Sequence, residues 1–435
     1  MAMIKQFLRY VLPSMAAFAF SGLYSIVDGY FVGNNVGDAG LAAINIAYPM
    51  IALVNSVGTG IGIGGAVFVS LTRGEGDAES EKKYLGNTLM FLLGASVVCT
   101  LLLLAVYRPF LQAFGATGEV LEGAKTYSLV LILCTALQVL ATGCIPLLRN
   151  FGAAVGAMLA MSGGFVSNIF LDWLFVQYMS LGLFGAALAT GIGQAVTVVP
   201  CAVFLFLRIR KMGGGVFSFS LRRIGKIAAV GASPFGLTLC PNITTLILNK
   251  FCLEFGGDTA VAAYAVVAYM YSVILFLLQG VGDGAQPLVS ACYGEGQEKT
   301  AKKFRNYAYV TALVTALVYF LALLFCRELI PKAFGTSDEA GALAARVLPI
   351  FGAGTLFTAI IKVTSSYFYS IGKSKVSYGL VYGELAIVFA AAFALSSFLK
   401  LDGVWLALPL TQAVLCVAAI AILFALSRKN KFKNI

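Results

Sequence analysis

The sequence predicts an all-α integral membrane protein with twelve transmembrane helices, arranged as two pseudo-symmetric six-helix bundles. Three observations predict this class. Of the 435 residues, 60% are hydrophobic and only 11% are charged, whereas a soluble domain carries about 25% charged residues. Apolar stretches of about 20 residues, the length that crosses a ~30 Å hydrocarbon core, recur along the whole chain. The second half of the chain also repeats the first at an offset of 220 residues.

The apolar stretches define the expected spans and leave no segment long enough for a soluble domain. The first stretch could be mistaken for a signal peptide. It is too long for one, carries Asp28 and lacks a convincing cleavage site, so we expect a retained helix. In chain order, the spans cover residues 7–31, 41–71, 85–107, 124–148, 153–177, 182–208, 225–253, 259–291, 304–326, 343–370, 376–399 and 402–426.

The net charge of +11 is distributed unevenly along the chain. With both termini placed in the cytoplasm, the inside segments, which include Arg149, hold 22 of the 30 Lys and Arg residues. The outside segments hold seven, and Lys362 falls inside a span. An excess of bases on the cytoplasmic side is the usual signal of membrane orientation. The charge therefore predicts topology, and no nucleic-acid partner is needed to explain it.

Cysteine and histidine usage excludes several kinds of site. Eight of the nine cysteines fall within expected spans and Cys292 directly follows one; none has a C-x-x-C or metal-ligand spacing, so we interpret them as small core residues. The absence of histidine excludes histidine metal sites, Ser-His-Asp triads and histidine proton relays. No nucleophile–base pair is visible either. We expect neither an enzyme nor a cofactor, and any proton chemistry must use carboxylates.

The internal repeat is clearest over positions 60–83, where ten of 24 residues are identical to those at 280–303. Six spans per copy is an even number, so the copies enter the membrane in the same sense and are related by an axis along its normal. We expect an N-terminal lobe at 1–212, a flexible cytoplasmic linker at 213–224 and a C-terminal lobe at 225–435. Two such lobes could rock about a central site.

Glycines and prolines recur inside the spans. Residues 58–65 contain a formal G-x-G-x-x-G, but no strand precedes it, so we expect close helix packing rather than a dinucleotide site. Each proline frees a carbonyl, which a neighbouring group, water or an ion must satisfy. The prolines inside spans are Pro13, Pro49, Pro146, Pro200, Pro234, Pro241, Pro287, Pro349 and Pro409.

Charged residues inside the spans are few and therefore informative. Asp28 and Asp172 lie roughly 6 to 10 residues before an outer loop, and so share a depth. Asn168 lies one turn before Asp172 on the same face. Thr190 reaches that depth from the sixth span. These four residues predict an oxygen-lined site for a hard cation or a shared proton. The alternative is a polar cluster that only holds helices together.

Asp283, Lys362 and Glu384 lie about 8 to 10 residues from inner helix ends in the second lobe. They could share a level, where a lysine–carboxylate pair would act as a gate or a substrate contact. A structural salt bridge is an equally good interpretation. We add the neighbouring Gln286 and Pro287 to these candidate substrate or gating residues.

The sequence resembles the multidrug and toxic compound extrusion (MATE) transporters over almost its whole length. The resemblance rests on the doubled layout, on Pro13 with residues 28–33 (DGYFVG), and on residues 286–290 (QPLVS) leading to Tyr293 and Gly294. The spacing of Asn168, Asp172 and Thr190 also looks like the cation site of that family. The resemblance implies that these three residues and Asp28 bind Na⁺ or H⁺, and that Asp283 falls where some relatives carry an acid.

The hypothesis that follows is a Na⁺- or H⁺-coupled antiporter that exports lipophilic, often cationic, small organic compounds. We expect it to lie in the bacterial plasma membrane as a monomer, with the lipid bilayer as its surroundings. The alternative is a flippase for lipid-linked saccharides or peptidoglycan precursors. A flippase would be expected to line its cavity with bases, whereas away from their ends the spans hold four acids and one lysine. A passive channel lacks a ring of filter segments.

Overall fold

The computed structural model describes residues 2–432, and the side chains of these except 24–26, 38 and 426–432. Lys433, one of the bases used to predict orientation, lies outside the described residues, as do the side chains of Arg428, Lys429 and Lys431. The elements are α1 (Ala2–Val36), α2 (Asp38–Gly74), α3 (Ala78–Ala113), α4 (Gly118–Leu133), α5 (Thr135–Asn150), α6 (Ala154–Asp172), η1 (Trp173–Tyr178), α7 (Gly182–Met212), α8 (Leu221–Gly294), α9 (Glu298–Cys326), α10 (Leu329–Ala333), α11 (Asp338–Ser370), α12 (Ser374–Leu399) and α13 (Leu401–Phe432).

Twelve spans follow from these helices, as predicted. Among the described residues, ten helices are individually long and apolar enough to cross a membrane. The pair α4 and α5, bent by 56°, forms one more span. The long helix α8 is two spans, because its backbone breaks at Gly257, where φ is 61°. Such a positive φ is open to glycine at little cost, and the break lies where the sequence places an outer loop.

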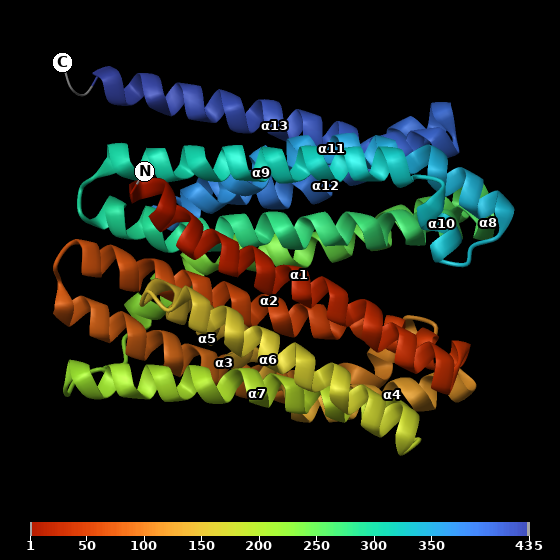
Figure 1. The fold of residues 1–435 in the computed structure, drawn as a ribbon, viewed down its shortest axis with the longest axis horizontal. Helices are drawn as coiled ribbons and strands as arrows, with labels where there is room; N and C mark the ends of the chain where they lie inside the picture. Colours follow the sequence, from red (N-terminus) through yellow and green to blue (C-terminus); the bar gives the residue numbers. More distant parts are fainter. Residues whose placement is uncertain (1, 433–435) are drawn as a thin grey trace.

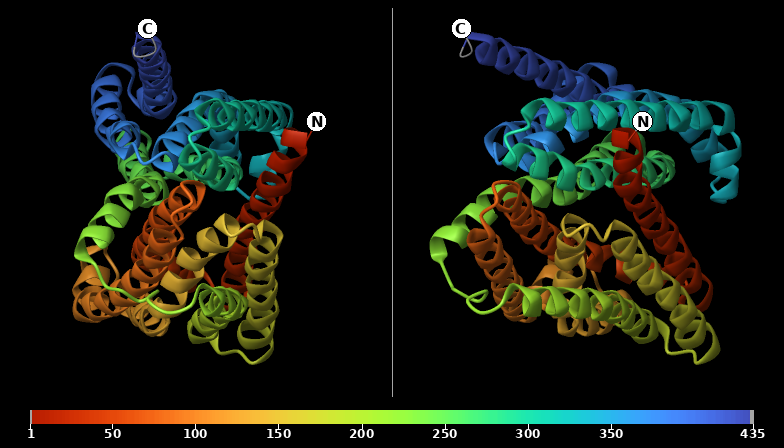
Figure 2. Two further views of the ribbon diagram at one scale, coloured as in Figure 1. Left: turned by 90° about the vertical axis from the view of Figure 1, so that its left-hand side faces the viewer. Right: turned by 60° about the vertical axis from the view of Figure 1, so that its left-hand side comes forward.

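The helices form two bundles, with α2 to α7 in one and most of α8 to α13 in the other (Figure 1). Two helices cross between them (Figure 2). The start of α1 packs in the second bundle, where Phe7 stacks on Phe304, and its far part belongs to the first, where Val32 is in the core. The first part of α8 crosses in the opposite sense, with Ile227 in the core of the first bundle and Leu248 in that of the second.

Glycines allow the bundles to approach closely where α2 meets α8. A Cβ on Gly60 would lie 2.9 Å from the carbonyl oxygen of Gly231, and one on Gly64 would overlap the Ile227 carbonyl. At the equivalent place in the second copy, a Cβ on Gly284 would lie 2.7 Å from the Cα of Val11 in α1. The glycine repeat therefore serves helix packing, which confirms the interpretation of the formal dinucleotide motif.

Two hydrogen bonds hold the linker between the bundles against α3. The buried Asn87 of α3 donates to the carbonyl of Ser218 at 2.8 Å and accepts from the backbone N–H of Ser220 at 2.8 Å. Val216 is buried, and its carbonyl lies against Gly86 of α3. Gly213 and Gly215 have φ of 76° and 83°. Both values lie in the left-handed region, so these glycines form turns that fold the segment onto α3.

Gly74 and Gly294 mark one end of the molecule, at the left of Figure 1, which we call the inner end. The charge asymmetry predicts that this end faces the cytoplasm.

Candidate functional site

The structure brings Asp28, Asn168, Asp172 and Thr190 together from α1, α6 and α7. Asn168, Asp172 and Thr190 are 2%, 0% and 7% exposed. In the amide orientation that satisfies both of its ends, Asn168 donates to Asp172 Oδ2 at 3.3 Å and accepts from the Thr190 N–H at 3.1 Å. The Thr190 hydroxyl donates to the carbonyl of Ala186 at 3.1 Å. The residue counts along the spans therefore correctly predicted that these side chains meet.

The two carboxyl groups of this cluster lie within hydrogen-bonding reach of one another. The Oδ1 atoms of Asp28 and Asp172 are both buried and have no hydrogen-bond partner among the described residues. A buried carboxylate oxygen without a partner is costly, and two facing carboxylates repel one another. A proton or a cation between the acids would relieve both costs.

A π-helical turn, η1, starts directly after Asp172. Such wide turns are rare and often lie at functional sites. Here the turn begins at Trp173 and its backbone is still paired into the loop, where Leu181 donates to the carbonyl of Phe175 at 2.8 Å. No periodicity in the sequence distinguishes this turn from an ordinary helix end, so the sequence did not predict it.

Asp283, Lys362 and Glu384 lie near one another in the second lobe, where Lys362 interacts electrostatically with both acids. Asp283 is paired with Arg149 of α5, at 3.5 Å between Oδ2 and Nη1. Lys362 instead donates to the carbonyl of Leu237 at 3.1 Å, and Glu384 is half-buried with no ion pair among the described residues. The direct ion pair of Asp283 is therefore with Arg149 of the other lobe, and among the described residues Lys362 has no direct ion pair with either acid.

Pro241 explains the position of Lys362. The N–H at residue 241 would bond to the carbonyl of Leu237, four residues earlier, but proline has no N–H. Lys362 is only 8% exposed, and its ammonium group reaches across from α11 to satisfy that carbonyl. This is the freed carbonyl that the prolines within spans predicted.

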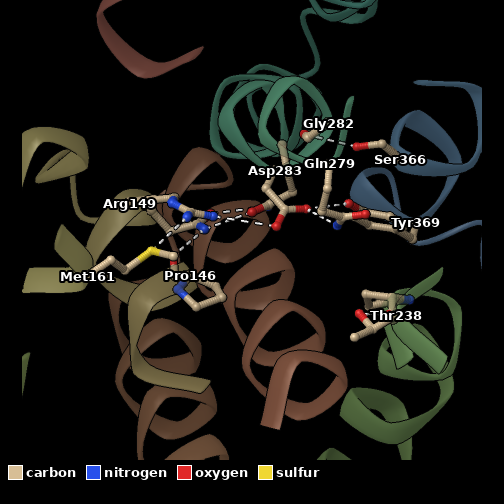
Figure 3. A network of polar contacts seen from close by, with 12 residues as sticks. Pro146, Arg149, Met161, Thr238, Gln279, Gly282, Asp283, Ser366 and Tyr369 are labelled. Atoms are coloured by element: carbon tan, nitrogen blue, oxygen red, sulfur yellow. Dashed lines mark hydrogen bonds and ion pairs between the residues drawn. The ribbon is translucent and has the colours of Figure 1, made fainter. Parts of the chain in front are cut away.

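Arg149 was missed as a site residue. The sequence placed it in a cytoplasmic segment after the fourth span, whereas it lies in the last turn of α5 and is only 3% exposed. Figure 3 shows its guanidinium group turned toward Asp283, beside Met161 and Pro146. Gln286 is also buried and pairs with Asn150, while Pro287 lies in α8 with no polar side chain of its own. Only the tertiary fold reveals these pairs.

A twelve-span chain with two pseudo-symmetric bundles and buried acids inside them has the architecture of a membrane transporter. The chain belongs to the MatE family, whose model matches residues 13–174 and 234–391. This confirms the resemblance noted in the sequence, and a member of this family is a transporter rather than an enzyme.

Curated relatives span nearly the whole chain. The multidrug export protein MepA of Staphylococcus saprophyticus is 23% identical over 441 residues, which cover 98% of this chain and 94% of the relative. The protein of the same name from Staphylococcus aureus strain MSSA476 is 24% identical over 449 residues, covering 97% and 94%.

Solved structures share the fold. One is a multidrug resistance MATE family transporter of the MOP superfamily in an outward-facing conformation, with a TM-score of 0.91, 24% identity and coverage of 99% of this chain and 96% of that one. Another is a MOP superfamily transporter from Pyrococcus furiosus, with a TM-score of 0.91, 24% identity and coverage of 98% and 96%. At these identities the likeness extends to the fold alone.

Proposed function

We propose that this chain is a cation-coupled antiporter that exports lipophilic, often cationic, compounds across a bacterial plasma membrane. Entry of Na⁺ or H⁺ drives the export, and the two bundles expose a central site to either side in turn. Both termini face the cytoplasm, and the transporter works as a monomer. The export of multiple drugs is supported by the names of the relatives, which are multidrug export proteins.

The observation that carries the coupling proposal is the pair of buried, unpartnered carboxylate oxygens on Asp28 and Asp172. Carboxylate, amide and hydroxyl oxygens are the ligands that a hard cation prefers. Asn168 and Thr190 supply the amide and hydroxyl beside the acids. A proton shared between the acids would relieve the same repulsion.

The site also involves α1, a helix that packs in both bundles. Asp28 belongs to α1, which packs in both bundles, whereas Asn168, Asp172 and Thr190 belong to the first bundle alone. A cation held between Asp28 and Asp172 draws α1 toward α6. Its release leaves two like charges facing each other across the same contact. Loading of the site therefore acts on a helix that links the two lobes.

The test is transport in liposomes with an imposed Na⁺ or pH gradient, followed by efflux of a fluorescent organic cation. Wild-type protein should export the dye in response to at least one of the two gradients. Asp28→Asn and Asp172→Asn should each abolish that export in a folded protein. Glu122→Gln removes an exposed acid that pairs with Lys125 near the start of α4, and should leave export unchanged. Undiminished export by both aspartate variants would refute the assignment of the site.

A further inference from the structure

The Arg149–Asp283 ion pair joins the two halves of the repeat. Arg149 belongs to α5 in the first bundle and Asp283 to the second part of α8. Nη1 and Oδ2 are 3.5 Å apart, and the two residues are only 3% and 4% exposed. Removing two charges from water costs free energy, and only a well-formed pair offsets this cost. The cost of burying this pair between the two lobes points to a role in holding them together.

Asp283 lies at the pseudo-symmetry axis. Its Oδ1 accepts from the hydroxyl of Tyr369 at 3.3 Å and from Gln279 at 2.8 Å, both within its own lobe (Figure 3). Tyr369 is the residue that the 220-residue offset pairs with Arg149. Asp283 therefore contacts equivalent positions of the two copies, which hold the polar Tyr369 in one copy and the charged Arg149 in the other.

A second polar pair crosses the lobes beside the first. Asn150 donates to Gln286 Oε1 at 2.8 Å, and Gln286 donates to Asn150 Oδ1 at 3.1 Å. Ser70 also donates to Asn150, at 2.5 Å. At the equivalent positions of the second copy, Ser290 donates to the carbonyl of Ser370 at 2.7 Å. The reciprocal amide bonds fix the register between the lobes as well as their separation.

The backbones of the two lobes are also in contact at this end. A methyl group on Gly74 would overlap the carbonyl of Ala291, and one on Gly294 would overlap the carbonyl of Leu71. These contacts are related by the same offset of 220 residues. The inner end is thus closed around the axis by a symmetric backbone contact and by the two polar pairs.

We propose that Arg149–Asp283 and Asn150–Gln286 form the inner gate of this transporter, and that they are positioning residues whose separation opens the central site to the inner end. The gate rests on the alternating access in the proposed function. An antiporter must close one end before it opens the other, and these pairs bind the lobes only when the inner end is closed. Their strength therefore sets the balance between the two states.

Each member of the ion pair keeps partners in its own surroundings when the gate opens. Asp283 retains the hydroxyl of Tyr369 and the amide of Gln279. Arg149 retains the ring of Phe18, 5.3 Å from its guanidinium carbon, and the sulfur of Met161 at 3.5 Å. These contacts lower the cost of leaving a charge unpaired, so the gate can open and close repeatedly rather than lock.

The experiment measures opening directly. Val67 is fully buried in an apolar cluster that both lobes form with Val230 and Tyr369. With Val67→Cys in a cysteine-replaced background, a membrane-impermeant maleimide applied from the inner side reports opening as a labelling rate. Arg149→Gln and Asp283→Asn should each raise that rate at least about tenfold, because either one leaves a buried charge unpaired.

A control variant and a double variant distinguish opening of the gate from non-specific destabilisation of the protein. Glu122→Gln breaks an ion pair with Lys125 inside the first lobe, and should leave the rate unchanged. In Arg149→Gln/Asp283→Asn, the rate should rise less than the product of the single effects, because the second change removes the stranded charge. Single variants that label like wild type, or multiplicative effects in the double variant, would overturn the gate.

Arg149→Lys keeps the charge but loses the reach and the forked donors of the guanidinium group, so it should raise the rate less than Arg149→Gln does. An equal rise would also overturn the proposal. Size-exclusion profiles establish that each variant is folded. Gradient-driven efflux, measured in the same vesicles, tests the coupling separately: its absence in wild type would refute the antiport, while the labelling rates still judge the gate.

Discussion

Lys362→Met tests whether a buried lysine stabilises a helix by replacing the hydrogen bond that a proline removes. The variant keeps most of the side-chain volume but loses the donor that reaches the carbonyl of Leu237 at 3.1 Å. Leu237 is 7% exposed, so water has little access to that carbonyl. A buried acceptor left without a partner costs about 1–3 kcal/mol. Removing a buried ammonium group offsets part of this cost, and we expect a net loss of about 1–2 kcal/mol.

Pro241→Ala provides the second arm of the measurement. Alanine restores the N–H that bonds to the carbonyl of Leu237 four residues earlier. In the Lys362→Met background it should recover at least about 1 kcal/mol, whereas in the wild-type background the carbonyl already has a donor and the gain should be smaller. Pro200→Ala, in a helix of the other bundle, serves as the control and should have the same effect in both backgrounds.

Thermal unfolding in detergent measures these differences. For a unit of 150–250 residues, the size of one lobe, 1 kcal/mol corresponds to a change in Tm of about 2–4 °C. Lys362→Met should therefore lower Tm by about 2–8 °C, and Pro241→Ala should restore much of that loss. If Pro241→Ala changes Tm equally with and without Lys362, the lysine does not satisfy the carbonyl and the reasoning is refuted.

Three further changes test other parts of the structure. Asn87→Ala removes both hydrogen bonds that anchor the linker, and should cost about 1–2 kcal/mol and speed proteolysis of residues 213–220; unchanged cleavage would contradict the anchoring. Gly74→Ala places a methyl group against the backbone of the other lobe and should raise maleimide labelling at the inner end, while Gly94→Ala, which meets no atom within 4 Å, should not. Hydrogen bonds from Ser80 hold the pKa of Asp77 below its usual 3.8. The contribution of this helix cap to stability is therefore present above pH ~3.8 and lost as the pH falls below it, and Asp77→Ala should remove that acid-dependent part of Tm.

The sequence predicted most of the fold because a bilayer leaves few choices. A chain whose apolar stretches are about 20 residues long must form helices, since the hydrocarbon core cannot satisfy free backbone groups. Depth along a helix is fixed by its rise, so Asp28, Asp172 and Thr190 could be assigned to one level from residue counts alone. Their meeting required only that three neighbouring helices face each other.

The contacts between the lobes could not be predicted in this way. Arg149 was counted with the cytoplasmic bases because it follows an apolar stretch, and only the packing of α5 against α8 places it opposite Asp283. The same limit applies to Lys362, which lies near the acids as expected but donates its hydrogen bond to a backbone carbonyl. Charges inside a membrane identify candidate residues, but the tertiary fold selects their partners.

Charge movement upon cation addition tests the central claim, that the acids of the first lobe bind the coupling ion. On a solid-supported membrane without any exported compound, a step in Na⁺ concentration or in pH should displace charge in vesicles that contain wild-type protein. The double variant Asp28→Asn/Asp172→Asn should give no such displacement while remaining folded. Equal charge movement in wild type and in the double variant would contradict the account, because the ion would then bind elsewhere.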